Sequence, residues 1–342
     1  APSTVFKKSG SVSYAISGLP SYVGGTIAEK SALTLQTPAS FRARFNVDVR
    51  VRHEVVAIDR ARKVVTVRDL ENGREFAESY DKLVLSPGAR PVVPPLPGID
   101  GKNIFTLRTV EDALRIREFV DATHPASATV VGGGFIGLEM AENLAERGAK
   151  VTIVEKMEQL LSPLDADMAA FVHAKFRAVG VSLRLGCAVT GFEDRDGQVV
   201  TNVDVGPAIA ANMVILAIGV SPDSGLAKAA GLALGARGSI LVDKHMRTPD
   251  ADIYAVGDAV QVENGVTGQA ALIALAGPAN KQGRVAADNI AGLDRAYRAS
   301  WGSSVVKLFD MTAAATGLNE RAAKAAGLGC DKVVLSPASP AS

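Results

Sequence analysis

The stretch Ala128–Lys156, ATVVGGGFIGLEMAENLAERGAKVTIVEK, decides the fold of this chain. An apolar run enters a turn that carries Gly132, Gly134 and Gly137 at G-x-G-x-x-G spacing. An amphipathic helical stretch follows the turn, and a second β-rich run ends at Glu155. A strand, glycine turn, helix, strand and terminal acid in this register predict a Rossmann-like βαβ unit.

Each part of this unit has a physical role in binding a dinucleotide. The first glycine permits a tight turn, the second lets the backbone approach a pyrophosphate, and the third lets the helix pack on the strand. The free N–H groups and positive dipole end of the helix favour phosphate. Glu155 is placed to accept hydrogen bonds from a ribose diol. A glycine-rich turn without a ligand would not require all these parts, so the stretch predicts a nicotinamide dinucleotide site.

Composition predicts a soluble, cytoplasmic protein with more than one domain. The 342 residues are 47% hydrophobic, which suffices for two or more cores. A net charge of +1 argues against nucleic acid or an acidic membrane as partner. No apolar stretch approaches the roughly 20 residues that cross a bilayer. The two cysteines fit a reducing cytoplasm, and the four scattered histidines predict no metal site.

The segments on either side of the unit predict a second α/β unit that the first one interrupts. Before it, we expect a strand at Ser3–Lys7, a helix start and loop over Ser13–Gly25, a β-rich run over Phe41–Asp59 with Lys63–Arg68 as its hairpin partner, and a strand at Asp81–Leu85. The proline-dense stretch Pro91–Pro97 predicts a linker. Later elements are expected at Thr109–Val120 (helix), Met213–Ile218 and Asp252–Asp258 (strands), Leu275–Ile290 (helix) and Ser304–Glu320 (beginning as a strand).

Eight motifs stand in a fixed order along the chain: SYAISGLPSYVGG, HEVVAID, YDKLVLSPGARPVVPPLPGID, GGGFIGLEMAENL, LAIGVSPD, TPDADIYAVGD, LAGPANKQGR and KLFDMTAAATGLNE. This order resembles the FAD-dependent pyridine nucleotide–disulfide oxidoreductases, and more narrowly the branch of coenzyme A disulfide reductase, NADH oxidase, NADH peroxidase and persulfide reductase. The resemblance implies an α/β fold with two Rossmann-like domains. An NAD(P)H domain, 123–243, would interrupt an FAD domain, 1–122 and 244–300, and 301–342 would begin an α+β dimer-interface domain of a homodimer.

The resemblance also implies roles for individual residues. Phe135 would be an aromatic gate over the flavin, although a core aromatic fits it equally well, and Glu139 would lie near the nicotinamide. FAD would contact Val55, Ser86, Pro87, Gly88, Asp258, Leu275 and Ala276. NAD(P)H would contact Gly132, Gly134, Ile136, Gly137, Glu155 and Gly219. Coenzyme A would meet Ser13, Arg42, Arg44, Asn280 and Arg284, for most of which solvated surface charge is the simpler interpretation.

Three features depart from the family pattern. Ser17 stands at the redox cysteine of the S-x-x-x-C-G-x-P motif, and a hydroxyl cannot carry out thiolate chemistry. Lys7 replaces the acid that would bind the FAD ribose. The family's N-terminal strand, glycine triplet and helix are not found before Ser3. Cys187 and Cys330 are expected to be structural. Ser17 thus suggests an inactivated or thiol-independent form.

The function expected is hydride transfer from NAD(P)H to FAD and on to a coenzyme A disulfide, a persulfide or dioxygen. Glu155 favours NADH because it would repel a 2′-phosphate, whereas the adjacent Lys156 leaves NADPH open. Two alternatives remain: a reductase of a ferredoxin or rubredoxin, and a non-catalytic remnant that binds a nucleotide or coenzyme A.

Overall fold

The apolar run before the glycine turn forms the central strand of a five-stranded parallel sheet. The computed structural model describes residues 3–336. Residues 1–2 and 337–342, which belong to the expected domain segments 1–122 and 301–342, lie outside the described residues. The sheet has the strand order β10 (Ile104–Phe105), β17 (Met213–Leu216), β11 (Ser127–Val131), β12 (Lys150–Val154) and β13 (Ser182–Arg184). The order reverses at β11, and ligands of such sheets bind where the order reverses, outside the carboxyl ends of the strands.

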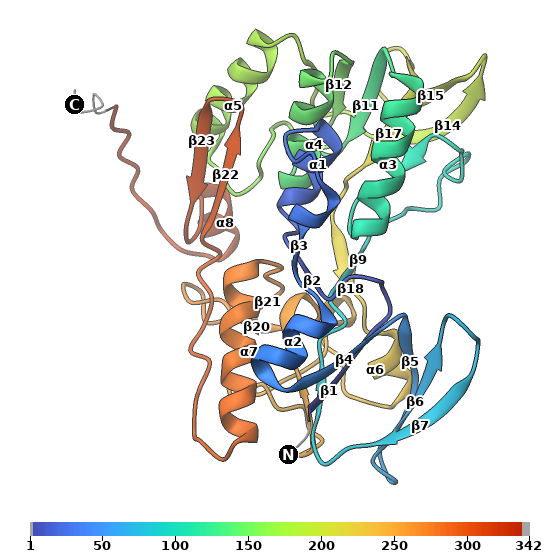
Figure 1. Cartoon of the computed structure of the whole chain (residues 1–342). Helices are drawn as coiled ribbons and strands as arrows, with labels where there is room; N and C mark the ends of the chain where they lie inside the picture. Colours follow the sequence, from blue (N-terminus) through green and yellow to red (C-terminus); the bar gives the residue numbers. More distant parts are fainter. Residues whose placement is uncertain (1–2, 337–342) are drawn as a thin grey trace, which may run out of the picture.

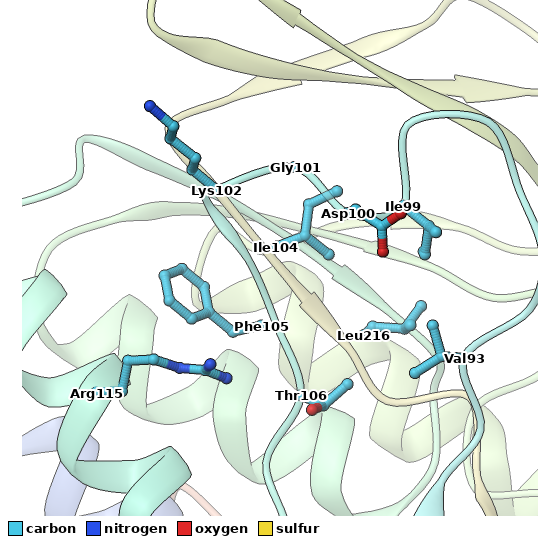
Figure 2. A pocket seen from close by; sticks show the side chains of 10 residues that line it. All are labelled: Val93, Ile99, Asp100, Gly101, Lys102, Ile104, Phe105, Thr106, Arg115 and Leu216. Carbon is cyan, nitrogen blue, oxygen red and sulfur yellow. The ribbon is translucent and has the colours of Figure 1, made fainter.

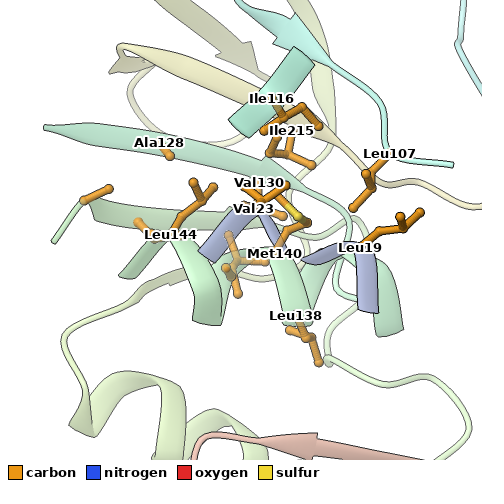
Figure 3. Close-up of a cluster of buried hydrophobic side chains, with 14 of the residues drawn as sticks. Leu19, Val23, Leu107, Ile116, Ala128, Val130, Leu138, Met140, Leu144 and Ile215 are labelled. Carbon is orange, nitrogen blue, oxygen red and sulfur yellow. The ribbon is translucent and has the colours of Figure 1, made fainter. Parts of the chain in front are cut away.

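Helices cover this sheet in the upper lobe of Figure 1: α3 (Val110–Thr123), α4 (Phe135–Glu146) and α5 (Ala166–Ala178). A second, antiparallel sheet packs against the inner strands β11 and β17 of the first; it is made of β14 (Val189–Arg195), β15 (Gln198–Val203) and β16 (Ile209–Ala211). The helix α1 (Gly18–Gly24) packs against α3 and α4, although it comes from the N-terminal part of the chain. Leu19 and Val23 of α1 are buried in one core with Met140 of α4 and Val130 of β11 (Figure 3).

The lower lobe contains the β-rich N-terminal region and most of the chain after β17. A parallel pair, β1 (Ser3–Lys7) and β4 (Val47–Val51), lies beside an antiparallel sheet of β5 (His53–Asp59), β6 (Val64–Asp69) and β7 (Glu75–Ser79). β8 (Leu83–Leu85) pairs in parallel with β19 (Ile253–Ala255). The helices are α2 (Pro38–Phe45), α6 (Gly225–Ala229) and α7 (Ala276–Ile290), with the 3-10 turns η2 (Ala236–Gly238) and η3 (Gly257–Ala259).

Short elements connect the lobes and end the chain. β9 (Ala89–Pro91) pairs with β18 (Val220–Pro222) between the lobes, and β2 (Ser13–Tyr14) pairs with β3 (Thr34–Gln36) after the 3-10 turn η1 (Lys30–Leu33). A small hairpin joins β20 (Val262–Glu263) and β21 (Ala270–Ala271). The last elements are the hairpin β22 (Ser304–Leu308) and β23 (Met311–Ala315), and α8 (Glu320–Ala325); this hairpin packs against α4 of the upper lobe (Figure 1).

The α/β fold class is confirmed, and so are the predicted strands at β1 and β11, the β5–β6 hairpin and the helices α3 and α7. The β-rich expectation was wrong for Phe41–Phe45, which belongs to α2. Thr37 caps this helix: its side chain accepts from the Ser40 amide, and Ser40 accepts in return from the Thr37 amide. This capping box outweighs the β-rich pattern of the residues that follow.

Segments on either side of residues 123 and 243 pack together within each lobe. β10 and α3, which precede residue 123, belong to the upper lobe, because β10 pairs with β17 and α3 contributes to its core. The segment from β18 to residue 243 packs into the lower lobe, where Ala227, Leu232 and Ile240 share a core with Val67 and Tyr254. None of the helices within residues 3–336 is long and apolar enough to cross a membrane.

Candidate functional site

The glycine turn joins β11 to α4 at the point where the sheet order reverses. Gly132 has a φ of +112°, and a Cβ there would lie 2.3 Å from the carbonyl oxygen of Ala217. A Cβ on Gly137 would lie 2.0 Å from the Gly132 oxygen, so both glycines are required by packing. A Cβ on Gly134, the N-cap of α4, would meet nothing within 4 Å. The first turn of α4 therefore presents its amides to open space, which is the arrangement that binds phosphate.

Glu155 follows β12 and turns back to the glycine turn. Its carboxylate accepts hydrogen bonds from the amide of Gly133 at 2.6 Å and from the amide of Met157 at 2.7 Å. Each carboxylate oxygen keeps a second acceptor position, so a ribose diol can still donate to it. The carboxylate thus stabilises the turn and supplies negative charge beside it.

The remaining residues expected at the nicotinamide dinucleotide lie around the same end of the sheet. Gly219 follows β17, which runs beside β11, and has a φ of +111° with open space in front of its Cα. Ile136 and Phe135 lie in the first turn of α4, where both are half-buried against the core of the upper lobe. The core interpretation of Phe135 therefore has structural support, and its side chain lies at the end of α4 that faces the turn.

Glu139 lies one turn further along α4 and is half-buried. Burial raises the pKa of Glu139 to about 7, and the nearby carboxylate of Glu142 adds to the rise. Glu142 itself accepts a hydrogen bond from the amide of Phe309, at the turn between β22 and β23, at 2.5 Å. Glu139 is thus a carboxyl group that can hold or release a proton near neutral pH.

A second group of expected residues meets in the lower lobe. β8 and β19 are parallel neighbours, so Ser86, Pro87 and Gly88 follow one strand where Gly257 and Asp258 follow the other. Arg108 links the two: its Nη2 donates to Oδ2 of Asp258 at 2.9 Å and its Nε to the carbonyl oxygen of Ala89 at 2.9 Å. The side chains of Arg108 and Asp258 are each only 19% exposed.

Arg108 and Gln282 both bond to the turn that carries Asp258, and neither was predicted from the sequence. Gln282 on α7 is buried and accepts the Gly257 amide at 2.7 Å, which ties α7 to the turn that carries Asp258. Leu275 is the N-cap of α7 and Ala276 its first residue. The sequence around Arg108 shows only that it stands just before Thr109, the cap of α3, and does not indicate Asp258, which lies 150 residues away. The sequence around Gln282 likewise does not indicate Gly257, which lies 25 residues away.

Two further positions concern the expected FAD site: Val55, which would contact FAD, and Lys7, which replaces the acid expected to bind the FAD ribose. Val55 lies in β5 opposite Val67, where the register with β6 shifts, so its backbone leaves the regular ladder. Lys7 is half-buried with its Nζ 5.5 Å from the centre of the Tyr14 ring. Burial and the positive charge of Arg108 lower the pKa of Lys7. An ammonium group has no acceptor, so Lys7 cannot bind a ribose diol as an acid would.

Ser17 is exposed at the N-terminus of α1, and its side chain makes no capping hydrogen bond to the helix. Ser13 lies nearby in β2 and is half-buried. The two cysteines lie elsewhere: Cys187 is buried, with its Sγ 3.5 Å from the Val205 oxygen, and Cys330 is exposed after α8. Ser17 is thus an exposed residue beside a helix that is anchored in the upper lobe.

The residues expected for coenzyme A, apart from Ser13 in β2, lie on the two helices α2 and α7. Arg42 and Arg44 lie on α2, and Arg44 contacts the ring of its neighbour Phe45. Asn280 and Arg284 lie on α7, where Asn280 donates to the carbonyl of Ala276 on the same helix. Within residues 3–336, no hydrogen bond or ion pair joins the side chains of the two helices. Within the same residues, no group of three His, Cys, Asp or Glu side chains could hold a metal ion.

A cavity of about 370 Å³ lies at the open edge of the upper sheet (Figure 2). Phe105 and Leu216 form part of its wall, and Arg115 stacks over the Phe105 ring at 5.7 Å. None of the residues expected to bind a cofactor lines it. The lining of the cavity therefore does not include the glycine turn or the Arg108–Asp258 pair.

Comparisons with known proteins identify the family of the chain. The family model described as pyridine nucleotide-disulphide oxidoreductase matches residues 2–283. The NADH oxidase of Methanocaldococcus jannaschii is 34% identical over 315 residues, which are 92% of this chain and 70% of that protein. The structure of reduced Bacillus anthracis CoADR-RHD is 45% identical with a TM-score of 0.93, and the match covers 95% of this chain.

The match covers only 58% of the Bacillus anthracis chain, so this chain spans less than two thirds of that relative. The water-forming NADH oxidase of Lactobacillus brevis, whose structure is bound to NADH, is 34% identical with a TM-score of 0.90 over 96% of this chain and 72% of its own. The family model covers the glycine turn and most of the lower lobe. The chain therefore belongs to the pyridine nucleotide-disulphide oxidoreductase family.

Proposed function

We propose that this protein is an FAD-dependent NAD(P)H oxidoreductase of the coenzyme A disulfide reductase and NADH oxidase type. The observation that carries the proposal is the glycine turn, where Gly134 leaves open space before the free amides of α4 and Glu155 lies beside it. The family match supports FAD as the second cofactor. The upper lobe would bind NAD(P)H, the lower lobe FAD, and the hairpin after residue 301 would begin an interface in a cytoplasmic homodimer.

The residues of the lower lobe fit FAD in part. Arg108 supplies a positive charge beside the Ser86–Gly88 loop, which suits a pyrophosphate, and Asp258 is a carboxylate suited to a hydroxyl of the ribityl chain. Val55 would meet the adenine end through its backbone. Lys7 does not fit the adenosine ribose, because it offers a donor where the diol needs an acceptor. FAD, when bound, supplies the capacity to accept a hydride and pass its electrons on.

The upper lobe would orient the nicotinamide dinucleotide. The amides of α4 would bind its pyrophosphate, and Gly219 would leave room for the chain beyond. Glu155 favours NADH because its negative charge would repel a 2′-phosphate. Phe135 lies at the start of α4, where it would pack beside the nicotinamide, and Glu139 would hold or release a proton at its carboxyl group.

The acceptor depends on position 17. Relatives are named coenzyme A disulfide reductase and NAD-dependent persulfide reductase, and both names imply sulfur acceptors. A serine hydroxyl has no disulfide chemistry, so with Ser17 we propose a thiol-independent form that reduces dioxygen. A coenzyme A disulfide or persulfide would be the acceptor of a form with cysteine at that position. Ser13, Arg42, Arg44, Asn280 and Arg284 stay candidates for contact with coenzyme A.

A second candidate is the reduction of a carrier protein. The exposed position of Ser17 favours it, because a site without a thiol can still pass electrons from its flavin to a partner at the surface. The structure of the putidaredoxin reductase–putidaredoxin complex supports this candidate, since that chain is 29% identical with a TM-score of 0.82.

The test is anaerobic addition of NADH to the purified protein. Bleaching of the flavin absorbance is expected, and a colourless protein that binds NADH would instead favour a non-catalytic remnant. Ser17→Cys is then assayed with coenzyme A disulfide, with Ser21→Cys, one turn further on α1, as the matched control. Turnover by Ser17→Cys alone is the result that supports a sulfur acceptor.

A further inference from the structure

The segment 156–164 crosses the glycine turn after Glu155, and we call it the strap. Leu160 of the strap is fully buried, and its Cδ2 lies 2.5 Å from the position of a Cβ on Gly133. The amide of Leu161 donates to the carbonyl oxygen of Gly133 at 2.9 Å. The strap thus holds the backbone of the turn from outside, by one hydrogen bond and by close packing.

The amide of Leu160 has its own partner on α5. It donates to Nε2 of His173 at 3.0 Å. A ring nitrogen accepts a hydrogen bond only when it carries no proton, so His173 is neutral here and bears its proton on Nδ1. When the ring is charged, both nitrogens are donors, and the buried Leu160 amide has lost its acceptor.

We propose that His173 is a positioning residue for the dinucleotide site, which holds the glycine turn in its binding shape through the strap as long as its ring is neutral. The inference rests on the proposed function only in taking the glycine turn as a nucleotide site. His173 itself would not touch the nucleotide. Its effect passes from the Leu160 amide to the Gly133 backbone, and from there to the first turn of α4.

The surroundings of His173 favour the neutral ring. Burial and the positive charge of Arg177, one turn along α5, lower the pKa of His173 from its ordinary value of 6.5. The hydrogen bond is therefore present at neutral pH and is lost as the pH falls through the lowered pKa of His173. The other charged groups of the strap, Lys156 and Glu158, are exposed. At the start of α5, Asp165 accepts a hydrogen bond from the Glu320 amide at 2.7 Å, and Asp167 is paired with Lys332 at 2.7 Å. Further along α5, Lys175 is paired with Asp310.

The far end of the strap is held by the C-terminal part of the chain. Asn319 donates to the carbonyls of Ser162 at 2.8 Å and Leu164 at 3.0 Å, and Arg321 donates to the carbonyl of Ser162 at 3.0 Å. These bonds do not titrate near neutral pH. Loss of the His173 bond therefore releases the Leu160 end of the strap while the Ser162–Leu164 end stays in place.

The experiment measures the affinity for ADP-ribose by titration calorimetry at pH 8 and pH 5.5. For the wild type we expect weaker binding at the lower pH, by up to about fivefold, the size of one hydrogen bond, as the protonated fraction of His173 grows. His173→Gln places an acceptor that does not titrate near the position of Nε2, so its affinity should change less between the two values than that of the wild type. His173→Phe has no acceptor and should bind weakly at both. His124→Asn, at an exposed helix end, is the matched control and should follow the wild type.

A change of affinity between the two pH values that is as large in His173→Gln as in the wild type, or wild-type affinity in His173→Phe, would overturn the proposal. Hydrogen exchange of the Leu160 amide gives a second reading that needs no ligand: its protection should fall between pH 8 and 5.5 in the wild type and stay constant in His173→Gln. If ADP-ribose binds to no variant at pH 8, the dinucleotide site itself is refuted, and amide exchange still decides the role of His173. If His173→Phe does not fold, His173→Gln carries the test.

Discussion

The carboxylate of Glu155 is bonded to the amide of Gly133, 22 residues earlier, at 2.6 Å. This contact joins the end of the second strand of the nucleotide unit to the glycine turn. A residue expected only to recognise a ribose thus also shapes the turn that would bind the pyrophosphate. Substitutions here should change cofactor affinity and local stability together.

Glu155→Gln tests this double role. The carboxylate of Glu155 accepts from two backbone amides, whereas the side chain of glutamine has only one acceptor oxygen and would turn its NH₂ donor toward the other amide. We therefore expect about tenfold weaker NADH binding, from the loss of one charged hydrogen bond. NADPH binding should fall less or rise, because the repulsion of its 2′-phosphate is removed. Fluorescence titration with both nucleotides measures the ratio. Glu146→Gln on the exposed face of α4 is the control, and an unchanged ratio in Glu155→Gln would contradict the assignment.

Gly134→Ala and Gly137→Ala form a matched pair that separates binding from packing. The new methyl group at Gly134 enters open space, so stability should change by less than about 1 kcal/mol while NADH binding is lost. At Gly137 the methyl group meets the Gly132 oxygen, and overpacking of this kind costs about 1–3 kcal/mol. Urea unfolding and NADH titration of both variants check the prediction. Equal loss of stability in the two would show that the space at Gly134 is not free.

Glu139→Gln should stabilise the protein more at pH 8 than at pH 5. The pKa of Glu139 is raised by burial to about 7, so the folded state holds a proton that the unfolded state releases near 4.5. Stability therefore falls as the pH rises from 4.5 to 7, by at most about 3 kcal/mol. Glutamine removes this loss, and urea unfolding at both pH values measures it. The exposed Glu146→Gln should show no such difference between the two.

Arg108→Ala removes the partner of a carboxylate in the lower lobe. Because both side chains are mostly buried, Asp258 is left without its charge partner, and we expect a loss of about 1–3 kcal/mol. Less FAD should also be retained through purification. Arg115→Ala, whose side chain is 60% exposed, is the control. Full retention of FAD in Arg108→Ala would argue against a phosphate contact at this position.

The sequence by itself determined the nucleotide unit, because all of its parts lie within one continuous stretch. β11, the turn, α4 and β12 follow one another over 127–154, and their periodicities and glycine spacing report the local hydrogen bonds and close approaches directly. The β5–β6 hairpin was predictable for the same reason. The capping box that turned Phe41–Phe45 into a helix was equally local, but its Thr-x-x-Ser signal precedes the segment.

Only the tertiary structure decided the relations between distant segments. The packing of α1 on α4, the pairing of β10 with β17, the ion pair of Arg108 with Asp258 and the hydrogen bond of Leu160 to His173 join positions that no periodicity connects. Such contacts depend on how apolar faces are buried against one another, and many sequences could satisfy them with other partners. A residue such as His173 therefore looks ordinary in the sequence, and its role follows from the one backbone amide that folding brings to its ring.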